Sequence, residues 1–393
     1  YGIYNVVGGV IGMVGFLNAA LTSASQRFIS FELGRENHER LSGIFSAAII
    51  THTCLAVLIF LIAETLGLWF LNTQLNIAEC RMSAANWVFQ CAILTTLVSI
   101  LNVPYNSLLV ANERLDIYAY LAIANSIFKL LIVYLLLVSP WDKLITYSLL
   151  GLVVQVSFQM AYMLYCRKNF PESRQIRKPS SEMFFQMFSF AGWSVVGNLG
   201  FSFKDQASNV ILNLFFGTAI NAARGIATQV NGIVYSFSTS FTMALNPQIT
   251  KTYSAGNIQE TVKMVYTSCR LTPFLMGVMC IPLMVNMEYI LNLWLGNVPK
   301  YTVEFMQLTM VSAIIGCIAA PISIALQATG KIKLFQIAIS ITLLCELPCA
   351  YLILKCGGQP YMAMFPTVVV TFIGVYVRFI ILKRMIKDYN ILR

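Results

Sequence analysis

Charged side chains within long apolar stretches are the residues of this sequence best suited to binding or chemistry. A charge inside a bilayer costs at least about 2.5 to 3.5 kcal/mol on insertion scales, so it usually faces protein or water. Arginine binds phosphate oxygens in a bidentate manner and lysine binds them as a point charge, so a cavity lined mainly by cations would suit a diphosphate group. The candidate binding residues are Lys129, Lys204, Asp205, Arg224 and Arg270, with Glu346 as the second opposing acid.

Each of these cations also has a simpler explanation. Lys129 and Arg270 could snorkel, with a long stem along the helix and the charged group at the membrane interface. Arg224, at the end of an apolar stretch, could be an ordinary cation at the edge of a loop. Lys204 could bridge to the neighbouring Asp205, although adjacent residues point to different sides of a helix.

The residues that commonly bind metals are too few or too scattered to form a site. Histidine occurs only at His38 and His52, which excludes a histidine metal cluster by number. The ten cysteines lie mostly in apolar stretches, where cysteine acts as a small apolar residue. The segment CELPC at 345–349 also lies within such a stretch and has no histidine nearby. We therefore expect no metal and no cofactor.

The composition places the chain in a membrane. Hydrophobic side chains make up 58% of the 393 residues and charged ones 11%, too few polar groups to cover a soluble protein of this size. The net charge of +10 is explained by basic loops on one side of a membrane, so we expect no nucleic-acid partner. Windows of about 19 residues predict eleven spans, near 2–24, 41–71, 84–110, 115–138, 143–166, 184–215, 222–246, 259–295, 302–328, 331–355 and 360–382.

The loops between these spans alternate in charge. Lys and Arg are frequent in one set, which includes the polar insert at 167–182, and sparse in the other, which includes Lys300. Loops rich in Lys and Arg stay in the cytoplasm. The sequence therefore predicts a multi-pass protein with a cytoplasmic C-terminus.

An internal repeat divides the chain into two lobes. The segment PYNSLLVANERLDIY at 104–118 aligns with PISIALQATGKIKLF at 321–335, and YGIYNVVGGV at 1–10 aligns with RGIATQVNGI at 224–233. The paired spans cross in the same direction, so the repeat is parallel. Because the second copy begins with a span that the first lacks, we predict an all-α membrane fold of two six-helix lobes, in which the first helix of the N-terminal lobe is missing. The predicted boundaries are 1–166 for the N-terminal lobe, 167–183 for a cytoplasmic linker and 184–393 for the C-terminal lobe.

Two prolines occupy equivalent positions in the two copies of the repeat. They are Pro104 and Pro321, each within a predicted span. Proline can break or bend a membrane helix where neighbouring groups satisfy the freed carbonyl. We predict equivalent bends at these positions and consider both prolines candidate hinges.

The sequence also resembles a known family. NLFFGTAINAARGIATQVNGIVYSFSTSFTMALNPQITKTYSAGN at 213–257 and NVPYNSLLVANERLDIYAYL at 102–121 resemble the flippases for lipid-linked oligosaccharides of bacterial polysaccharide and O-antigen synthesis. These flippases belong to the multidrug/oligosaccharidyl-lipid/polysaccharide exporter superfamily, which has two six-helix lobes. The resemblance implies a transporter of the bacterial inner membrane, not an enzyme, that flips undecaprenyl-diphosphate-linked oligosaccharide by alternating access. The expected partners are this substrate and the membrane lipids.

Two other function classes compete with a flippase. A sodium- or proton-coupled multidrug exporter of the same fold should carry acidic residues in its cavity, and the excess of embedded cations argues against it. A membrane enzyme such as a polyprenyl-linked glycosyltransferase usually needs a sizeable external loop with acidic residues, and the predicted external loops are short. No residue pattern identifies a coupling ion or the sugar.

Overall fold

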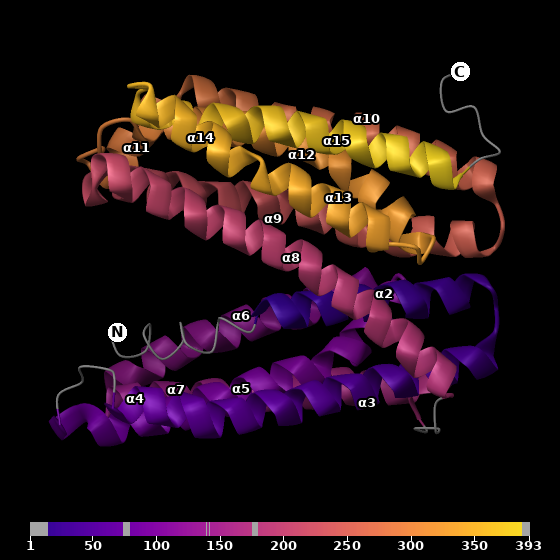
Figure 1. The fold of residues 1–393 in the computed structure, drawn as a ribbon. Coiled ribbons are helices and arrows are strands. Elements are labelled where there is room, and N and C mark those ends of the chain that lie inside the picture. Colours follow the sequence, from indigo (N-terminus) through magenta and orange to yellow (C-terminus); the bar gives the residue numbers. More distant parts are fainter. Residues whose placement is uncertain (1–14, 74–78, 139, 141, 175–179, 387–393) are drawn as a thin grey trace. The chain divides into compact units, whose positions relative to one another are not determined.

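The computed structural model describes residues 15–73, 79–138, 140, 142–174 and 180–386. Every regular element within these ranges is a helix, which confirms the predicted all-α class (Figure 1). The predicted span near 2–24 falls partly outside the described residues. The prediction of a missing first helix lies outside them as well.

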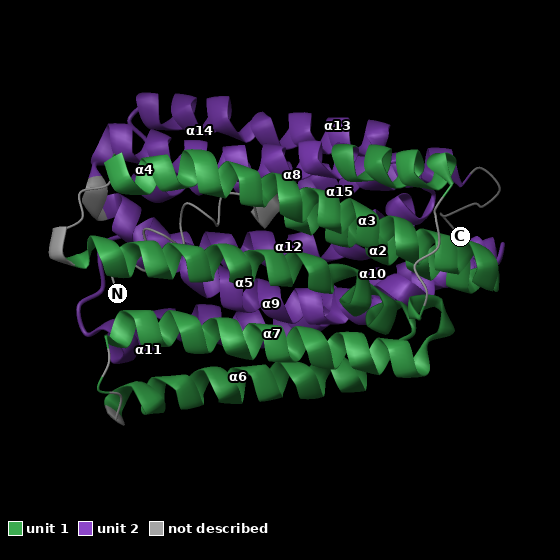
Figure 2. Ribbon diagram, turned by 90° about the horizontal axis from the view of Figure 1, so that it is seen from below, with its two compact units in different colours: residues 1–192 green, residues 193–393 purple. Residues whose placement is uncertain are grey.

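The chain divides into two compact units, residues 1–192 and 193–393 (Figure 2). In the first unit, α5 is the central helix, because it packs against α2, α3 and α7. Its elements are α2 (Gly15–Gly34), α3 (His38–Ile62), the π-helical turn η1 (Ala63–Gly67), α4 (Leu68–Thr73), α5 (Glu79–Ala111), α6 (Leu115–Val138), α7 (Lys143–Asn169) and the 3-10 turn η2 (Pro171–Ser173).

The second unit repeats this plan around α12, which packs against α9, α10 and α15. Pro104 lies inside α5 and Pro321 inside α12, so the aligned prolines belong to the central helix of each unit. Both helices continue through their prolines, and a hinge role for them stays a prediction. Its elements are the part of α8 (Ser181–Phe216) that follows residue 192, α9 (Thr218–Ser254), α10 (Ile258–Val285), α11 (Met287–Leu295), α12 (Thr302–Ala328), α13 (Lys333–Leu344), α14 (Glu346–Lys355), η3 (Pro360–Met364) and α15 (Phe365–Met385).

The division between the units falls inside α8. The described residues of the predicted linker, 167–183, belong to the end of α7, the turn η2 and the start of α8, and 175–179 lie outside the described residues. The division at residues 192 and 193 is therefore several residues beyond the predicted start of the C-terminal lobe at 184. Helix α8 is continuous through it.

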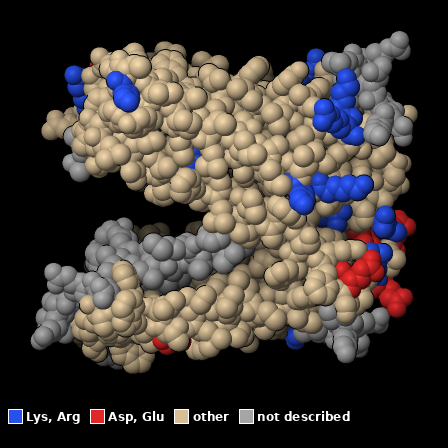
Figure 3. Space-filling view, viewed as in Figure 1, with Lys and Arg blue, Asp and Glu red and all other residues tan. Residues whose placement is uncertain are grey.

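Eight helical stretches of the described residues are long and apolar enough to cross a membrane. Helices α8 and α9 are longer than a bilayer requires but are not among these eight stretches, and they carry Lys204, Asp205 and Arg224. Many large apolar side chains are exposed, as lipid contact requires. In the face drawn in Figure 3, Lys and Arg gather mainly toward the ends of the helices. The protein is a multi-pass membrane protein.

One predicted span is broken in its middle. The range 331–355 forms two helices, α13 and α14, which meet at Cys345. Pro348 explains the position of the break, because a proline ring collides with the carbonyl four residues earlier, and α13 ends at that residue, Leu344. The break places Glu346 in the first turn of α14.

Candidate functional site

Lys204 and Glu346 form a buried ion pair in the second unit. The Lys204 Nζ atom lies 3.4 Å from Glu346 Oε2, and the two side chains are 10% and 4% exposed. Thr367 of α15 donates its hydroxyl to Glu346 Oε1 at 2.7 Å. The pair therefore joins α8, α14 and α15.

Arg224 and Asp205 form a second pair, between α9 and α8. Arg224 Nη2 donates to Asp205 Oδ1 at 2.9 Å, and Arg224 Nη1 contacts the Asp205 carbonyl oxygen and Asn209 Oδ1. Arg224 is 5% exposed. Lys204 and Asp205 thus point to different sides of α8, and each has its partner on another helix. The local Lys204–Asp205 bridge considered from the sequence does not form.

Arg270 and Lys129 are exposed and do not join these pairs. Arg270 lies on α10 with its guanidinium 5.7 Å from the centre of the Tyr266 ring, a cation–π contact. Lys129 lies on α6, in the first unit. No ion pair involving either residue is found among the described residues. The predicted residues therefore do not form one cluster within either unit.

The sequence analysis missed Arg378, a further cation inside the second unit. It is half-buried on α15, and its Nε donates to Ser323 Oγ of α12 at 3.0 Å. Its guanidinium also lies 5.8 Å from the centre of the Phe335 ring. The signal in the sequence was a single arginine in the apolar run VVVTFIGVYVRFIIL. Its closeness to the predicted end of the span at 382 made it resemble an interfacial cation.

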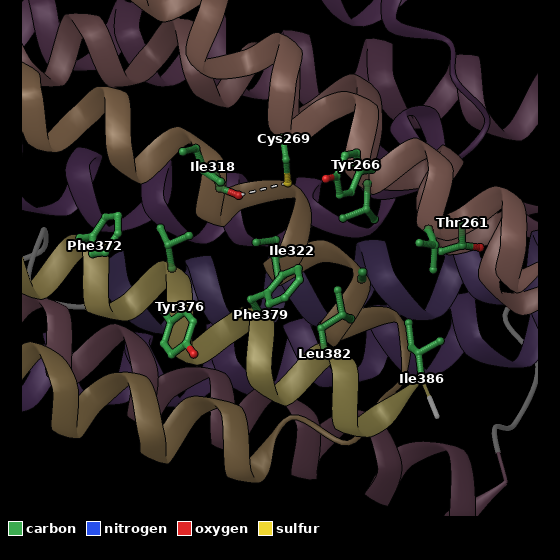
Figure 4. Close-up of a pocket in the computed structure, with 14 residues that line it drawn as sticks. Thr261, Tyr266, Cys269, Ile318, Ile322, Phe372, Tyr376, Phe379, Leu382 and Ile386 are labelled. Atoms are coloured by element: carbon green, nitrogen blue, oxygen red, sulfur yellow. Dashed lines mark hydrogen bonds between the residues drawn. The ribbon is translucent and has the colours of Figure 1, made fainter. Parts of the chain in front are cut away.

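An apolar groove of about 230 Å³ lies between α10, α12 and α15 (Figure 4). Helix α12 forms its floor, and α10 and α15 form its walls. The one hydrogen bond drawn in it runs from Cys269 Sγ to the Ile318 carbonyl oxygen, 3.5 Å apart. Its lining residues are Thr261, Val262, Val265, Tyr266, Cys269, Ile318, Ile322, Ala325, Phe372, Val375, Tyr376, Phe379, Leu382 and Ile386.

Metal-binding side chains do not gather in the part of the chain that the structure describes. No group of three His, Cys, Asp or Glu residues there is placed to hold a metal ion. His52 is fully buried in α3, where its Nδ1 contacts the Ala48 carbonyl oxygen at 2.8 Å. His38 is at the start of α3 and pairs with Glu172 of η2.

Comparison with known proteins identifies the fold. The profile of the MatE family matches residues 194–352, and no curated protein matches the sequence. A structure described as the outward-facing conformation of a multidrug resistance MATE family transporter of the MOP superfamily has a TM-score of 0.85. It is 12% identical and covers 100% of this chain and 88% of its own.

Two further structures have the same fold. The Vibrio cholerae MATE transporter VcmN in its bent form has a TM-score of 0.83, with 15% identity over 97% of this chain and 87% of its own. A MOP superfamily transporter from Pyrococcus furiosus, described as having a binding pocket of reverse polarity that suggests a different function, has a TM-score of 0.80. It is 13% identical over 98% of this chain and 92% of its own. The chain therefore has the fold of the MATE transporters.

Proposed function

We propose that this chain is a membrane transporter that works by alternating access and that its substrate is an anionic lipid-linked oligosaccharide. The fold supports the first part, because proteins with this arrangement of helices include named transporters. The charges of the second unit support the second part. The undecaprenyl-diphosphate carrier implied by the sequence resemblance has the matching chemistry, an anionic diphosphate.

The observation that carries this proposal is the pairing of the embedded acids in the second unit. Asp205 is paired with Arg224, and Glu346 with Lys204. Arg270 and Arg378 have no carboxylate partner among the described residues. The embedded charges of the second unit that have no partner of opposite sign among the described residues, Arg270 and Arg378, are therefore positive, which favours an anionic substrate over an organic cation. Lys204, which was a candidate for the diphosphate site, is assigned instead to its pair with Glu346.

A relative in fold supports a departure from drug export. The Pyrococcus furiosus transporter is described as having a binding pocket of reverse polarity, from which a different function is suggested for that protein. The MATE fold therefore occurs with more than one pocket charge. An anionic substrate is compatible with it.

The second candidate is a cation-coupled multidrug exporter, which the structural comparisons alone favour because a named multidrug transporter has the same fold. One residue also supports it. Glu64 lies in the π-helical turn η1 of the first unit, accepts a hydrogen bond from Gln90 Nε2 at 3.2 Å and has no cation partner among the described residues. Single π turns are frequent at functional sites.

Two bacterial strains distinguish these functions. One lacks its oligosaccharide flippase, and the other lacks its drug exporters. We expect the chain, expressed together with the enzymes that make its lipid-linked oligosaccharide, to restore surface polysaccharide in the first strain and to leave resistance to cationic drugs unchanged in the second. The opposite result would reject the flippase in favour of the exporter. In that case surface polysaccharide is not restored in the first strain, and the chain gives drug resistance in the second strain that Glu64→Gln abolishes.

The substitution Arg270→Ala tests the charge argument in the first strain. Loss of one charge-assisted hydrogen bond costs about 1.5 to 3 kcal/mol, or roughly 10- to 150-fold in affinity. Arg270→Lys should retain part of the activity, because the point charge is kept and the bidentate geometry is lost. Full activity of Arg270→Ala at matched expression would rule out Arg270 as a substrate contact.

A further inference from the structure

The end of the second unit at which α9, α12 and α15 terminate is strongly basic. Among the described residues, one acid lies there, Glu260, together with Lys251 of α9 and five further cations. These five are exposed, and no ion pair is found for them in the part of the chain that the structure describes. We call them the basic end of the second unit: Lys263 in α10, Lys331 and Lys333 at the start of α13, and Lys383 and Arg384 in the last turn of α15.

The cations of the basic end belong to one surface. Thr329 Oγ1 lies 3.7 Å from Met385 Sδ, which brings the segment before Lys331 beside the end of α15. Thr261 and Ile386 line the same groove, so the start of α10 lies beside that end as well. Figure 1 shows α10, α13 and α15 reaching the same end of the unit. Positive charge from three helices is therefore concentrated on one surface.

The first unit differs at the end where α2, α5 and α7 terminate, on the same predicted side of the membrane. Its cations pair in part with its acids, as Arg40 does with Glu32 at 3.3 Å and Arg114 with Asp116 at 3.0 Å. Among the described residues the bases there are Arg27, Arg35, Arg40, Arg114, Arg167, Lys168 and Arg174, and the acids are Glu32, Glu36, Glu39, Glu113, Asp116, Glu172 and Glu182. These charges balance. A preference for basic loops on one side of the membrane applies to both units, so it does not explain the excess in the second.

The basic end borders side chains that face lipid. On α15, Tyr376 is 62% exposed and precedes Lys383 by two helical turns on the same face. On α13, Leu334 follows Lys333 directly and is 56% exposed. Large apolar side chains exposed on a membrane protein contact acyl chains, and Lys and Arg extend from such surfaces to the interface. The cations of the basic end therefore lie where lipid head groups would meet them.

We infer that the basic end of the second unit binds the head groups of anionic phospholipids. The inference is independent of the proposed function, because it concerns the lipids around the protein and not a transported molecule. A soluble anion would meet the same charges but not the apolar side chains beside them, whereas an anionic phospholipid contacts both. Near a membrane surface each Lys or Arg changes the affinity for anionic lipid about fivefold, or about 1 kcal/mol.

Native mass spectrometry of the purified full chain tests this surface. The chain is released from phosphatidylcholine nanodiscs that contain graded fractions of phosphatidylglycerol, and the lipids that stay bound are counted. We expect wild type to retain phosphatidylglycerol in preference to phosphatidylcholine. The triple variant Lys331→Gln, Lys383→Gln, Arg384→Gln should lower the apparent affinity for phosphatidylglycerol about fivefold per cation removed and leave retention of phosphatidylcholine unchanged.

Two further variants separate local charge from net charge and from misfolding. The triple variant Arg35→Gln, Arg167→Gln, Lys168→Gln removes the same charge from exposed positions of the first unit and should bind phosphatidylglycerol as wild type does. The triple variant Lys331→Arg, Lys383→Arg, Arg384→Lys keeps the charge of the basic end and should also bind as wild type does.

Three results would overturn the inference. The first is unchanged affinity in the glutamine variant of the basic end. The second is an equal loss in the first-unit variant, which would show that only the net charge matters. The third is displacement of phosphatidylglycerol by millimolar inorganic pyrophosphate at constant ionic strength, which would assign the surface to a soluble anion.

Discussion

At the scale of single residues, the second unit holds its embedded acids by specific partners. Glu346 depends on two of them, the Thr367 hydroxyl at Oε1 and the Lys204 ammonium near Oε2. No hydrogen bond to Oε2 is found among the described residues, so the charge of Lys204 is what offsets the burial of this oxygen. The pair fixes the position of α14 just after the break in its span.

The substitution Lys204→Met should destabilise the protein strongly. It leaves a buried carboxylate unpaired, and breaking a buried pair in this way costs about 3 to 5 kcal/mol. The double variant Lys204→Met, Glu346→Gln should recover most of that loss, because no buried charge remains. Thermal unfolding in detergent measures both. A double variant as unstable as Lys204→Met alone would show that the two residues do not act as a pair.

At the scale of elements, the start of α7 is defined by one carboxylate. Asp142 accepts hydrogen bonds from the backbone N–H groups of Leu144 at 2.9 Å and Ile145 at 3.2 Å, and Arg81 of α5 also contacts it. The Ile145 backbone hydrogen bond, followed by that from Arg81, holds the pKa of Asp142 below its usual value. The residue therefore caps one helix and joins it to the central helix of the first unit.

The Asp142 cap should make stability depend on pH in the acidic range. A carboxyl group whose pKa is lowered by folding stabilises the protein above its unfolded pKa, about 3.9, and this contribution is lost as pH falls through the lower folded pKa. The difference in melting temperature between wild type and Asp142→Asn at pH 6 should shrink progressively as the pH falls below about 3.9. Asp142→Ala should melt below Asp142→Asn at every pH, since asparagine also caps helices. A constant difference between wild type and Asp142→Asn would contradict this account.

The sequence predicted the helices better than it predicted which side chains contact one another. Apolar stretches of sufficient length predicted the eight helical stretches that are long and apolar enough to cross a membrane, because burial in lipid requires such stretches regardless of tertiary contacts. The predicted spans near 184–215 and 222–246 form the helices α8 and α9 but are not among these eight. The break at Cys345 could have been predicted from the sequence, because a proline such as Pro348 disfavours the helix four residues before it. The ion-pair partner of Lys204 could not have been predicted, because Glu346 comes from a distant segment and only folding brings α8 and α14 together. The apolar groove was also not predictable, since each of its three helices looks like any other span.

At the scale of the whole molecule, the side of the membrane on which each loop lies is set by the distribution of Lys and Arg. The proposed cytoplasmic side includes Arg174, after α7, and the proposed outer side includes Lys300, before α12. Both residues are exposed, so a probe would reach either one from its own side.

Single cysteines in a cysteine-free variant test this orientation in intact cells. We expect Arg174→Cys to be protected from an impermeant maleimide and Lys300→Cys to react fully. Permeabilised cells provide the control, because both positions should then react. The reverse pattern in intact cells would invert the orientation of the whole chain.

Helix α8 runs without a break from the first unit into the second, and this affects how the two units can move relative to each other. Because the division between the units falls within this helix, their only covalent connection is a rod and not a loop. Within the second unit, α8 packs closely against α13 at two glycines. A methyl group at Gly197 would lie 2.2 Å from Gln336 Oε1, and one at Gly200 would lie 2.9 Å from Ser340 Oγ. At Gly192, beside the division, a methyl group would meet nothing. Glycine there adds no contact but softens the helix. A movement of one unit relative to the other would therefore have to bend α8, and Gly192 is the position near the division where the helix offers least resistance to bending.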